Sequence, residues 1–284
     1  MVALVKRNLK LYFLNVPGVI MSCLGALISF FIYIVFLQTT LENSWKHIFN
    51  ARTILDLWII AGIITIAGIT TSFQALGQIV TDRETRISDD IHLTDVPNWI
   101  QSLAYVISGT VISLIMQVIT LIVMSIYFSV VDKTIIPNNT YLILFLFMLI
   151  GSVVSTLMNE IIVFFIHSST TFSRLSAIIG AISGFVVATY MPYGALTTHV
   201  QTLIKLIPSS YEAVALRSLL LTQVDKTNLA TSIKEKLINY LGARFKINDH
   251  LLSILDIAYI MIGIVLGLTL IIMIISSIAD RKRK

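Results

Sequence analysis

Glu160 is the residue of this chain whose type and surroundings could most readily do chemistry. It lies inside the apolar stretch Tyr141–Ile166, about six residues from its end. At about 1.5 Å of rise per residue, a helix would place it roughly 9 Å from that end. A carboxylate among apolar residues is costly and marks a candidate functional site. Two interpretations remain open: structural pairing with Arg174, or a titrating role in transport.

The sequence carries no recognisable catalytic motif. It contains no G-x-x-x-x-G-K-[ST] phosphate loop, no H-E-x-x-H or C-x-x-C metal spacing and no G-x-S-x-G nucleophile motif. Cys23 is the only cysteine, so no disulfide can form within the chain. The five histidines are scattered: His47, His92, His167, His199 and His250. We therefore expect a protein that is not an enzyme, with no catalytic, cofactor or metal site.

Composition indicates that these residues belong to a membrane protein. The 284 residues are 56% hydrophobic and 12% charged, whereas soluble domains are roughly 45–50% apolar and about 25% charged. The net charge is +5, and the basic residues cluster at the ends of apolar stretches. This pattern is typical of an integral membrane protein and argues against a nucleic-acid partner.

Six apolar stretches can supply the 20 or so residues that a helix needs to cross the hydrocarbon core. They are Val16–Leu37, Leu55–Ile79, Ile100–Val131, Tyr141–Ile166, Ser176–Tyr190 with its extension, and Ile254–Ile278. Gly180 and Gly184 make the fifth stretch the least regular, and we expect them to be close-packing positions. The prediction is an all-α polytopic membrane protein with one transmembrane domain, residues 1–284.

The basic residues predict how the helices are oriented. With the N-terminus inside, ten basic residues fall in inner segments and three in the two short outer loops. The inner ones are Lys6, Arg7, Lys10, Arg83, Arg86, Arg174 and residues 281–284, and the outer ones are Lys46, Arg52 and Lys133. Cytoplasmic segments carry the excess of such residues, so we expect both termini in the cytoplasm. Residues 1–15 combine apolar side chains at helical spacing with basic ones, which predicts an interfacial helix.

The inner segment 81–99 is polar and reads TDRETRISDDIHLTDVPNW. Thr81 and Glu84 fit the capping-box pattern S/T-x-x-E, which predicts the start of a short helix with Ile87 and Ile91 on one face. We expect Pro97 to end this segment before the third span. A short charged helix at a membrane exit is either a solvated turn or a docking point for a cytosolic partner, and both interpretations remain open.

The segment 195–253 is the largest connection between spans. We expect Pro192 to break the fifth helix near its outer end, and Pro208 precedes a Ser-Ser pair of good N-cap residues. The helix that follows carries Glu212 and Arg217. Two helical patterns are present, Tyr211–Leu221 and Asn228–Leu241. A helix pair that re-enters the membrane and a soluble cap on its surface are both compatible with this segment.

Three features together resemble the permease subunit of type-2 ABC exporters. One is the layout of an interfacial N-terminal helix, six spans and two cytoplasmic ends. Another is Asp82-Arg83-Glu84, which is similar to the acidic–basic–acidic triplet of that family's coupling helix, with Arg86 where the family has glycine. The third is Met191-Pro192 followed by IPSSYEAVALRSLL, which is similar to the family's N-P-x-x-x-x-x-x-A-L-R helix, with Ile207 in place of asparagine.

This resemblance implies a pump whose motor is a separate protein. Permeases of the family pair as homo- or heterodimers and dock two cytosolic ATPase subunits, which bind ATP and magnesium, so this chain would carry no cofactor of its own. The implied coupling residues are Asp82, Arg83, Glu84, Arg86, Ile87 and Ile91, and the implied outer-gate residues are Pro192, Pro208, Tyr211, Glu212 and Arg217. The expected activity is export of an amphipathic cargo (a drug, peptide, lipid or lipid-linked glycan) across a bacterial plasma membrane.

Two other functions remain open. One is a proton-coupled secondary carrier with Glu160 as the titrating group, although such carriers show inverted repeats and several intramembrane charges, and we find neither in this sequence. The other is a non-transport membrane protein, such as a sensor or immunity factor, that binds a ligand with the outer segment 195–253.

Overall fold

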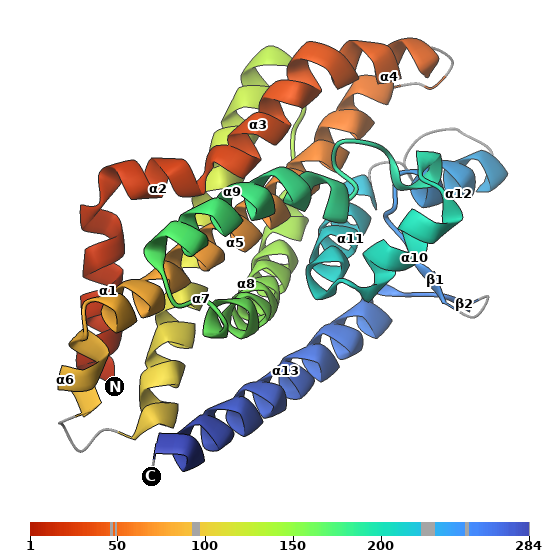
Figure 1. The fold of residues 1–284 in the computed structure, drawn as a ribbon. Coiled ribbons are helices and arrows are strands. Elements are labelled where there is room, and N and C mark those ends of the chain that lie inside the picture. Colours follow the sequence, from red (N-terminus) through yellow and green to blue (C-terminus); the bar gives the residue numbers. More distant parts are fainter. Residues whose placement is uncertain (46–47, 49, 93–96, 223–230, 248–249, 284) are drawn as a thin grey trace.

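The computed structural model describes residues 1–283 apart from 46–47, 49, 93–96, 223–230 and 248–249, and this described part is almost entirely helical (Figure 1). The α-helices are α1 (Val2–Leu14), α2 (Val16–Ser22), α3 (Leu24–Ile32), α4 (Gln38–Ser44), α5 (Ala51–Glu84), α6 (Ile87–His92), α7 (Asn98–Val131), α8 (Tyr141–Phe164), α9 (Ser169–Val186), α10 (Thr198–Leu206), α11 (Pro208–Leu220), α12 (Thr231–Tyr240) and α13 (Ile254–Arg283). The prediction of an all-α fold is confirmed.

Short elements complete the chain. A π-helical turn, η1 (Tyr33–Leu37), joins α3 to α4, and 3₁₀ turns η2 (Asn138–Thr140) and η3 (Tyr193–Ala195) precede α8 and α10. Strands β1 (Lys246–Ile247) and β2 (His250–Leu251) pair antiparallel, with Lys246 opposite Leu251. They lie in the segment 195–253, just before α13.

Five helical stretches in the described part of the chain are long and apolar enough to cross a membrane. They are Leu24–Ser44, Ala51–Glu84, Trp99–Val131, Asn138–Phe164 and Ile254–Ile275. Each overlaps one of the predicted spans, so the molecule has the character of a polytopic membrane protein.

The first span starts later than predicted. Instead of one helix from Val16, the chain forms the separate helix α2, whose start is capped by the Asn15 side chain, which accepts a hydrogen bond from the amide of Gly18 at 3.2 Å. A break at Cys23 then separates α2 from α3. Apolar composition continues through this turn, so hydropathy by itself did not reveal it.

Helix α9 lies where the fifth span is predicted, and it packs against α3 and α5. It is not among the five apolar stretches, because Arg174 and several serines and threonines lower its hydropathy. A Cβ on Gly184 would collide with the Tyr190 ring, so close packing is confirmed there, while the Cβ direction of Gly180 is open. The sixth span therefore stays a prediction.

Helix α5 is the centre of the molecule. It contacts α3, α7, α8, α9 and α11. Of the 18 residues that form its apolar stretch, 94% are buried, whereas the corresponding share for α13 is 11%. Its 34 residues extend about 51 Å at 1.5 Å per residue. A helix of this length is long enough to reach from one face of a bilayer to the other, since a bilayer with its headgroups is about 40–45 Å thick.

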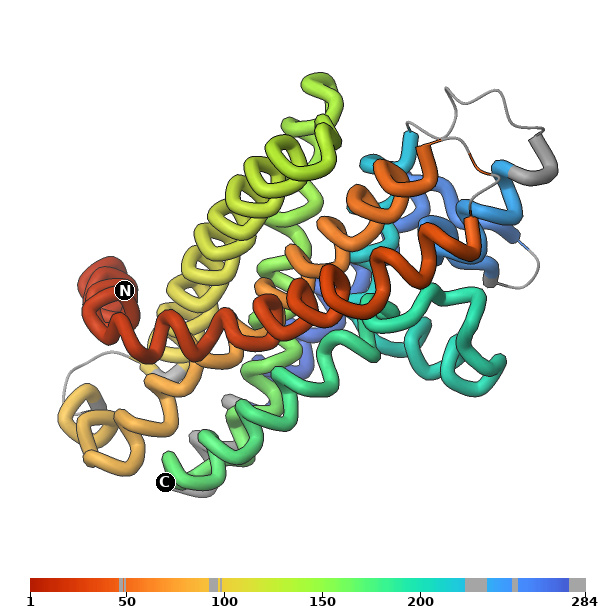
Figure 2. Tube along the Cα trace, turned by 90° about the horizontal axis from the view of Figure 1, so that it is seen from above, coloured from red at the N-terminus to blue at the C-terminus, as the bar shows by residue number. Residues whose placement is uncertain are grey.

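The two termini lie at one end of the bundle, together with α6, whereas α4, α12 and the strands lie at the other end (Figures 1 and 2). Helix α1 turns away from the direction of α3 and packs against α7 and α5 (Figure 1). This position suits a helix in the membrane interface. We refer to the end with the termini as the inner end.

Candidate functional site

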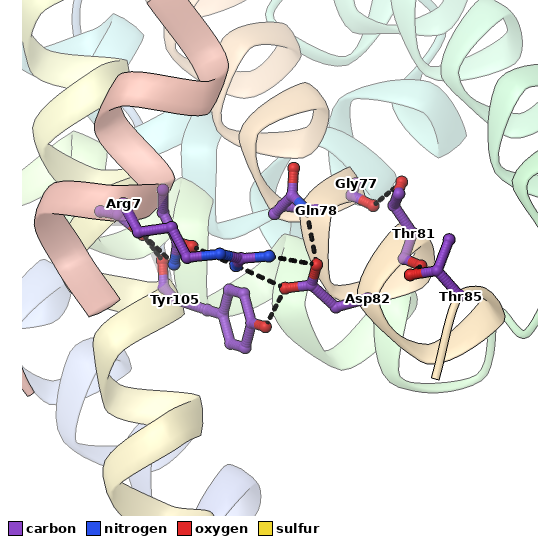
Figure 3. Close-up of polar contacts among 9 residues, drawn as sticks. Arg7, Gly77, Gln78, Thr81, Asp82, Thr85 and Tyr105 are labelled. Atoms are coloured by element: carbon purple, nitrogen blue, oxygen red, sulfur yellow. Dashed lines mark hydrogen bonds and ion pairs between the residues drawn. The ribbon is translucent and has the colours of Figure 1, made fainter. Parts of the chain in front are cut away.

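The inner end of α5 carries the triplet Asp82, Arg83 and Glu84, and Asp82 is its buried member. The Arg7 guanidinium donates to both carboxylate oxygens of Asp82, at 2.8 and 2.7 Å (Figure 3). The Tyr105 hydroxyl donates at 2.5 Å and the Gln78 amide at 2.7 Å. One carboxylate therefore joins α1, α5 and α7.

Arg83 and Glu84 hold the turn between α8 and α9 from two sides. The Arg83 guanidinium donates to the carbonyls of Phe164 and Ile166, at 3.2 and 3.4 Å, where α8 leaves carbonyls without helical partners. The Glu84 carboxylate accepts hydrogen bonds from the hydroxyl and, at 3.1 Å, from the backbone amide of Ser169, the first residue of α9. The partial positive charge of a helix N-terminus favours such a carboxylate.

The capping box predicted at Thr81 and Glu84 is wrong. Helix α5 runs without a break to Glu84, so Thr81 lies in its last turn and donates from its hydroxyl to the carbonyl of Gly77 at 3.3 Å. Glu84 instead caps α9. A capping-box spacing also occurs inside helices, and only the tertiary contact distinguishes the two cases.

The predicted short helix exists as α6, directly after α5. Arg86 has a φ of 59°, in the left-handed region, and this residue separates the two helices. Ile87 and Ile91 are half-buried, whereas Asp89 and Asp90 are exposed. Pro97 directly precedes α7, as predicted, but residues 93–96 lie outside the described part of the chain.

Glu160 is buried near the inner end of α8, yet its partner differs from the one considered from the sequence. Its Oε1 accepts a hydrogen bond from the Ser102 hydroxyl of α7. Its Oε2 is buried without a hydrogen-bond partner in the described structure. An ion pair with Arg174 does not occur among those of the described residues. Structural pairing is thus provided by a hydroxyl, which leaves half of the carboxylate unsatisfied.

The two prolines of the outer segment act differently from prediction. Helix α9 already ends at Val186, and the chain turns at Ala188, with a φ of 51°, so Pro192 does not break the helix. Pro208 is the first residue of α11 and Ile207 is its N-cap. Proline suits that first position because its missing N–H would have no helical partner.

The predicted serine caps lie inside α11 instead of ahead of it, whereas Tyr211 lies within the helix as predicted. The Ser209 hydroxyl lies 3.2 Å from that of Ser155 on α8, and the Ser210 hydroxyl donates to the carbonyl of Val186 at 3.1 Å. Tyr211 donates to the carbonyl of Lys205 at 2.9 Å. The start of α11 is therefore fixed between α8 and the end of α9.

Arg217 is a buried cation that caps a helix. It is 1% exposed, and its Nη2 donates to the carbonyls of Val187 and Ala188 at 2.8 and 3.0 Å, just beyond the end of α9. Its guanidinium lies 5.4 Å from the centre of the Trp58 ring of α5, a cation–π distance. Arg217 thus locks α11 to the end of α9 and to α5.

Glu212 also lies on α11 but does not pair with Arg217 among the described ion pairs. It is completely buried. The structure places its carboxyl against Gly151 of α8 and beside Gln117 of α7, which the sequence did not single out.

Several residues of the inner and outer ends were missed from the sequence. From the sequence, Arg7 counts only as an orienting charge, and Asp56 is not singled out. Asp56 is fully buried and accepts hydrogen bonds from Tyr33 and Thr134, at 2.7 and 2.9 Å. Asp56 and Asp82 are about 39 Å apart along α5, close to the full thickness of a bilayer. The sequence feature that could have singled out these two residues is an aspartate near each end of one predicted span.

No three His, Cys, Asp or Glu side chains in the described ranges are grouped closely enough to hold a metal ion. Comparisons of the chain with protein families, curated proteins and solved structures found no match.

Proposed function

We propose that this chain is the permease subunit of an ATP-driven exporter of the type-2 ABC class. It pairs with a second permease subunit, takes its ATPase subunits from the cytosol and moves an amphipathic cargo outward across a bacterial plasma membrane. Both termini and α6 face the cytoplasm in this proposal.

The observation that carries the proposal is the triplet at the inner end of α5. Asp82, Arg83 and Glu84 bind α1 and α7, the end of α8 and the start of α9, respectively. Helix α6 follows two residues later and exposes acidic side chains. A force applied to α6 by a cytosolic partner would therefore reach five helices at once through short polar contacts. Such a rigid junction is what coupling to a motor requires.

The outer segment supports the same function. Helices α10 and α11 form a hairpin at Pro208, and α11 contacts α5, α8 and α13. We infer that this hairpin re-enters the membrane from outside. Since Arg217 locks it to α9 and α5, release of that contact would open the bundle on its outer side.

Copurification tests the proposal directly. The tagged chain, extracted in mild detergent from its own host, is expected to bring down a cytosolic protein with a phosphate loop and ATPase activity. Export by the purified chain alone in liposomes, without an ATPase, would overturn the proposal.

A double substitution in α6 tests the docking role. In Ile87→Asp/Ile91→Asp, charges replace the half-buried apolar side chains, and we expect loss of ATPase copurification, at least tenfold, with normal insertion into the membrane. The matched control is Ile87→Val/Ile91→Val, which keeps the apolar surface and should retain the ATPase. ATP-driven export that survives the aspartate pair would exclude α6 as the docking element.

A second candidate, the proton-coupled carrier, rests on the unsatisfied Oε2 of buried Glu160. In that case Glu160→Gln should abolish pH-driven transport in liposomes, because glutamine cannot release a proton. Transport that is unchanged in this variant rules out the carrier.

A further inference from the structure

A buried polar pair lies at mid-depth in the bundle, away from the Asp82 junction and about one helical turn from the contact between Ser155 and Ser209. Gly68 of α5, Gln117 of α7 and Gly151 of α8 each fall in the central part of their helices. A Cβ on Gly151 would collide with the Glu212 carboxyl, and a Cβ on Gly68 would collide with the Gln117 amide. The two glycines therefore make room for these two polar groups in the interior.

Neither polar group is satisfied. Glu212 and Gln117 are both completely buried, and neither oxygen of Glu212 nor the amide oxygen and nitrogen of Gln117 has a hydrogen-bond partner in the described structure. The Gln117 amide lies beside the Glu212 carboxyl without a bond of normal geometry to it. Buried polar atoms are almost always paired, and an unpaired one costs roughly 1–3 kcal/mol or more. Four such atoms in one place need an explanation.

The charges of the surrounding helices do not supply a partner. On α11 itself Arg217 donates from its Nη2 to the carbonyls at the end of α9, and it forms no ion pair with Glu212 among the described ones. On α8 the closest charge is Glu160, nine residues from Gly151 and thus about 13 Å along the axis. The charged residues of α5 lie near its ends, and α7 carries none between Asn98 and Val131. The charged residues of α9 and α13 are Arg174, Asp256, Asp280 and the basic residues 281–283.

We propose that Glu212 and Gln117 form a mid-membrane binding site for one monovalent cationic group. The group is either an inorganic cation, sodium or potassium, or the ammonium end of an organic cargo. The carboxylate supplies one negative charge. The Gln117 amide supplies a further neutral ligand when it turns its oxygen, instead of its N–H, toward the carboxylate. Hard cations prefer such oxygen ligands, and a single carboxylate balances one positive charge but not two. Intramembrane carboxylates of this kind mark ion or substrate pathways.

The site is separate from α6, so it can be tested whether or not the chain docks an ATPase. Thermal unfolding of the purified protein, with the subunits it retains, is measured by tryptophan fluorescence at constant chloride. Sodium, potassium and methylammonium are compared with N-methylglucamine, which is too large for a site between packed helices. Binding to the folded state raises Tm, and we expect a rise of about 2–4 °C at a few times the dissociation constant. A response to sodium or potassium indicates an inorganic ion, and a response to methylammonium alone indicates an organic ammonium group.

Variants separate this site from general salt effects. Glu212→Gln should abolish the cation-dependent rise in Tm. In N-methylglucamine this variant should unfold at the same temperature as the unaltered protein or at a higher one, because the substitution removes an uncompensated buried charge. Gln117→Leu should weaken the rise. Glu235→Gln, the same chemical change at an exposed position on α12, should keep it. The proposal is overturned if no cation raises Tm, which would make Glu212 a neutral structural carboxyl, or if Glu212→Gln keeps the full response.

Discussion

Arg7 and Asp82 form an asymmetric ion pair. The arginine side chain is 30% exposed, whereas the aspartate side chain is 1% exposed. The hydrogen bonds with Asp82 raise the pKa of the Arg7 guanidinium, although partial burial opposes this. Loss of the arginine would leave a buried carboxylate without a positively charged partner. Loss of the aspartate charge would leave an arginine that can reach water or lipid headgroups.

This asymmetry predicts unequal stability effects. Arg7→Ala should destabilise the fold by about 2–3 kcal/mol, somewhat below the range for a fully buried pair. Asp82→Asn, which keeps a group for Tyr105 and Gln78 to contact, should cost about 1 kcal/mol. The double variant should cost less than the sum of the two, since the stranded charge is gone. Denaturant unfolding of the purified protein measures all three, and additive costs would contradict a direct pair.

At the scale of elements, glycines determine how closely the helices approach. On α8, Gly151 leaves space for the Glu212 carboxyl from α11, and on α5, Gly77 lies against the Phe172 ring from α9. In contrast, a Cβ on Gly263 or Gly267 of α13 would meet nothing within 4 Å. Nearly all apolar side chains of α13 between Ile254 and Ile275 are exposed or half-buried, so its outward face suits contact with lipid.

Two glycine-to-alanine substitutions test this packing. Gly151→Ala should destabilise the protein by about 1–3 kcal/mol, because its methyl group displaces a buried carboxyl. Gly263→Ala, at the open position on α13, should change stability by less than about 0.5 kcal/mol. Thermal unfolding of both variants under one condition provides the measurement, and equal effects at the two positions would argue against the α8–α11 contact.

At the scale of the whole molecule, the bundle has two chemically different ends. The inner end gathers both termini, α6 and the Asp82 junction, and the outer end gathers α4, α12 and the strands (Figures 1 and 2). The network around Asp56, with Tyr33 and Thr134, fastens the outer end as Asp82 fastens the inner one. Helix α5 thus connects two polar junctions across the apolar core.

The proposed orientation can be tested with single cysteines in a Cys23→Ser background. Lys6→Cys and Asp90→Cys, both exposed positions at the inner end, should resist a membrane-impermeant maleimide in intact cells and react after permeabilisation. Asn138→Cys, exposed at the opposite end of the bundle, should react in intact cells. The reverse labelling pattern would show that the protein is inserted the other way round.

Much of the fold could be predicted because it depends on local properties. The length of the apolar stretches located, to within several residues, five helices that are long and apolar enough to cross a membrane. The turn at Cys23 was not predicted, because the composition does not change there. The Asp82-Arg83-Glu84 triplet was also located at the end of a span from the sequence. Its partners were not, since Arg7 lies 75 residues from Asp82 and Ser169 lies 85 residues from Glu84.

The sequence by itself therefore determined that the chain is a helical membrane protein and where its polar residues fall along the helices. Only the tertiary structure decided which of them meet: Glu160 with Ser102 in place of Arg174, Glu84 with the start of α9, and Glu212 with Gln117. The physical reason is that hydropathy depends on each residue and its neighbours, whereas a buried polar contact depends on which helix faces pack together. That choice is made by the packing of the whole bundle.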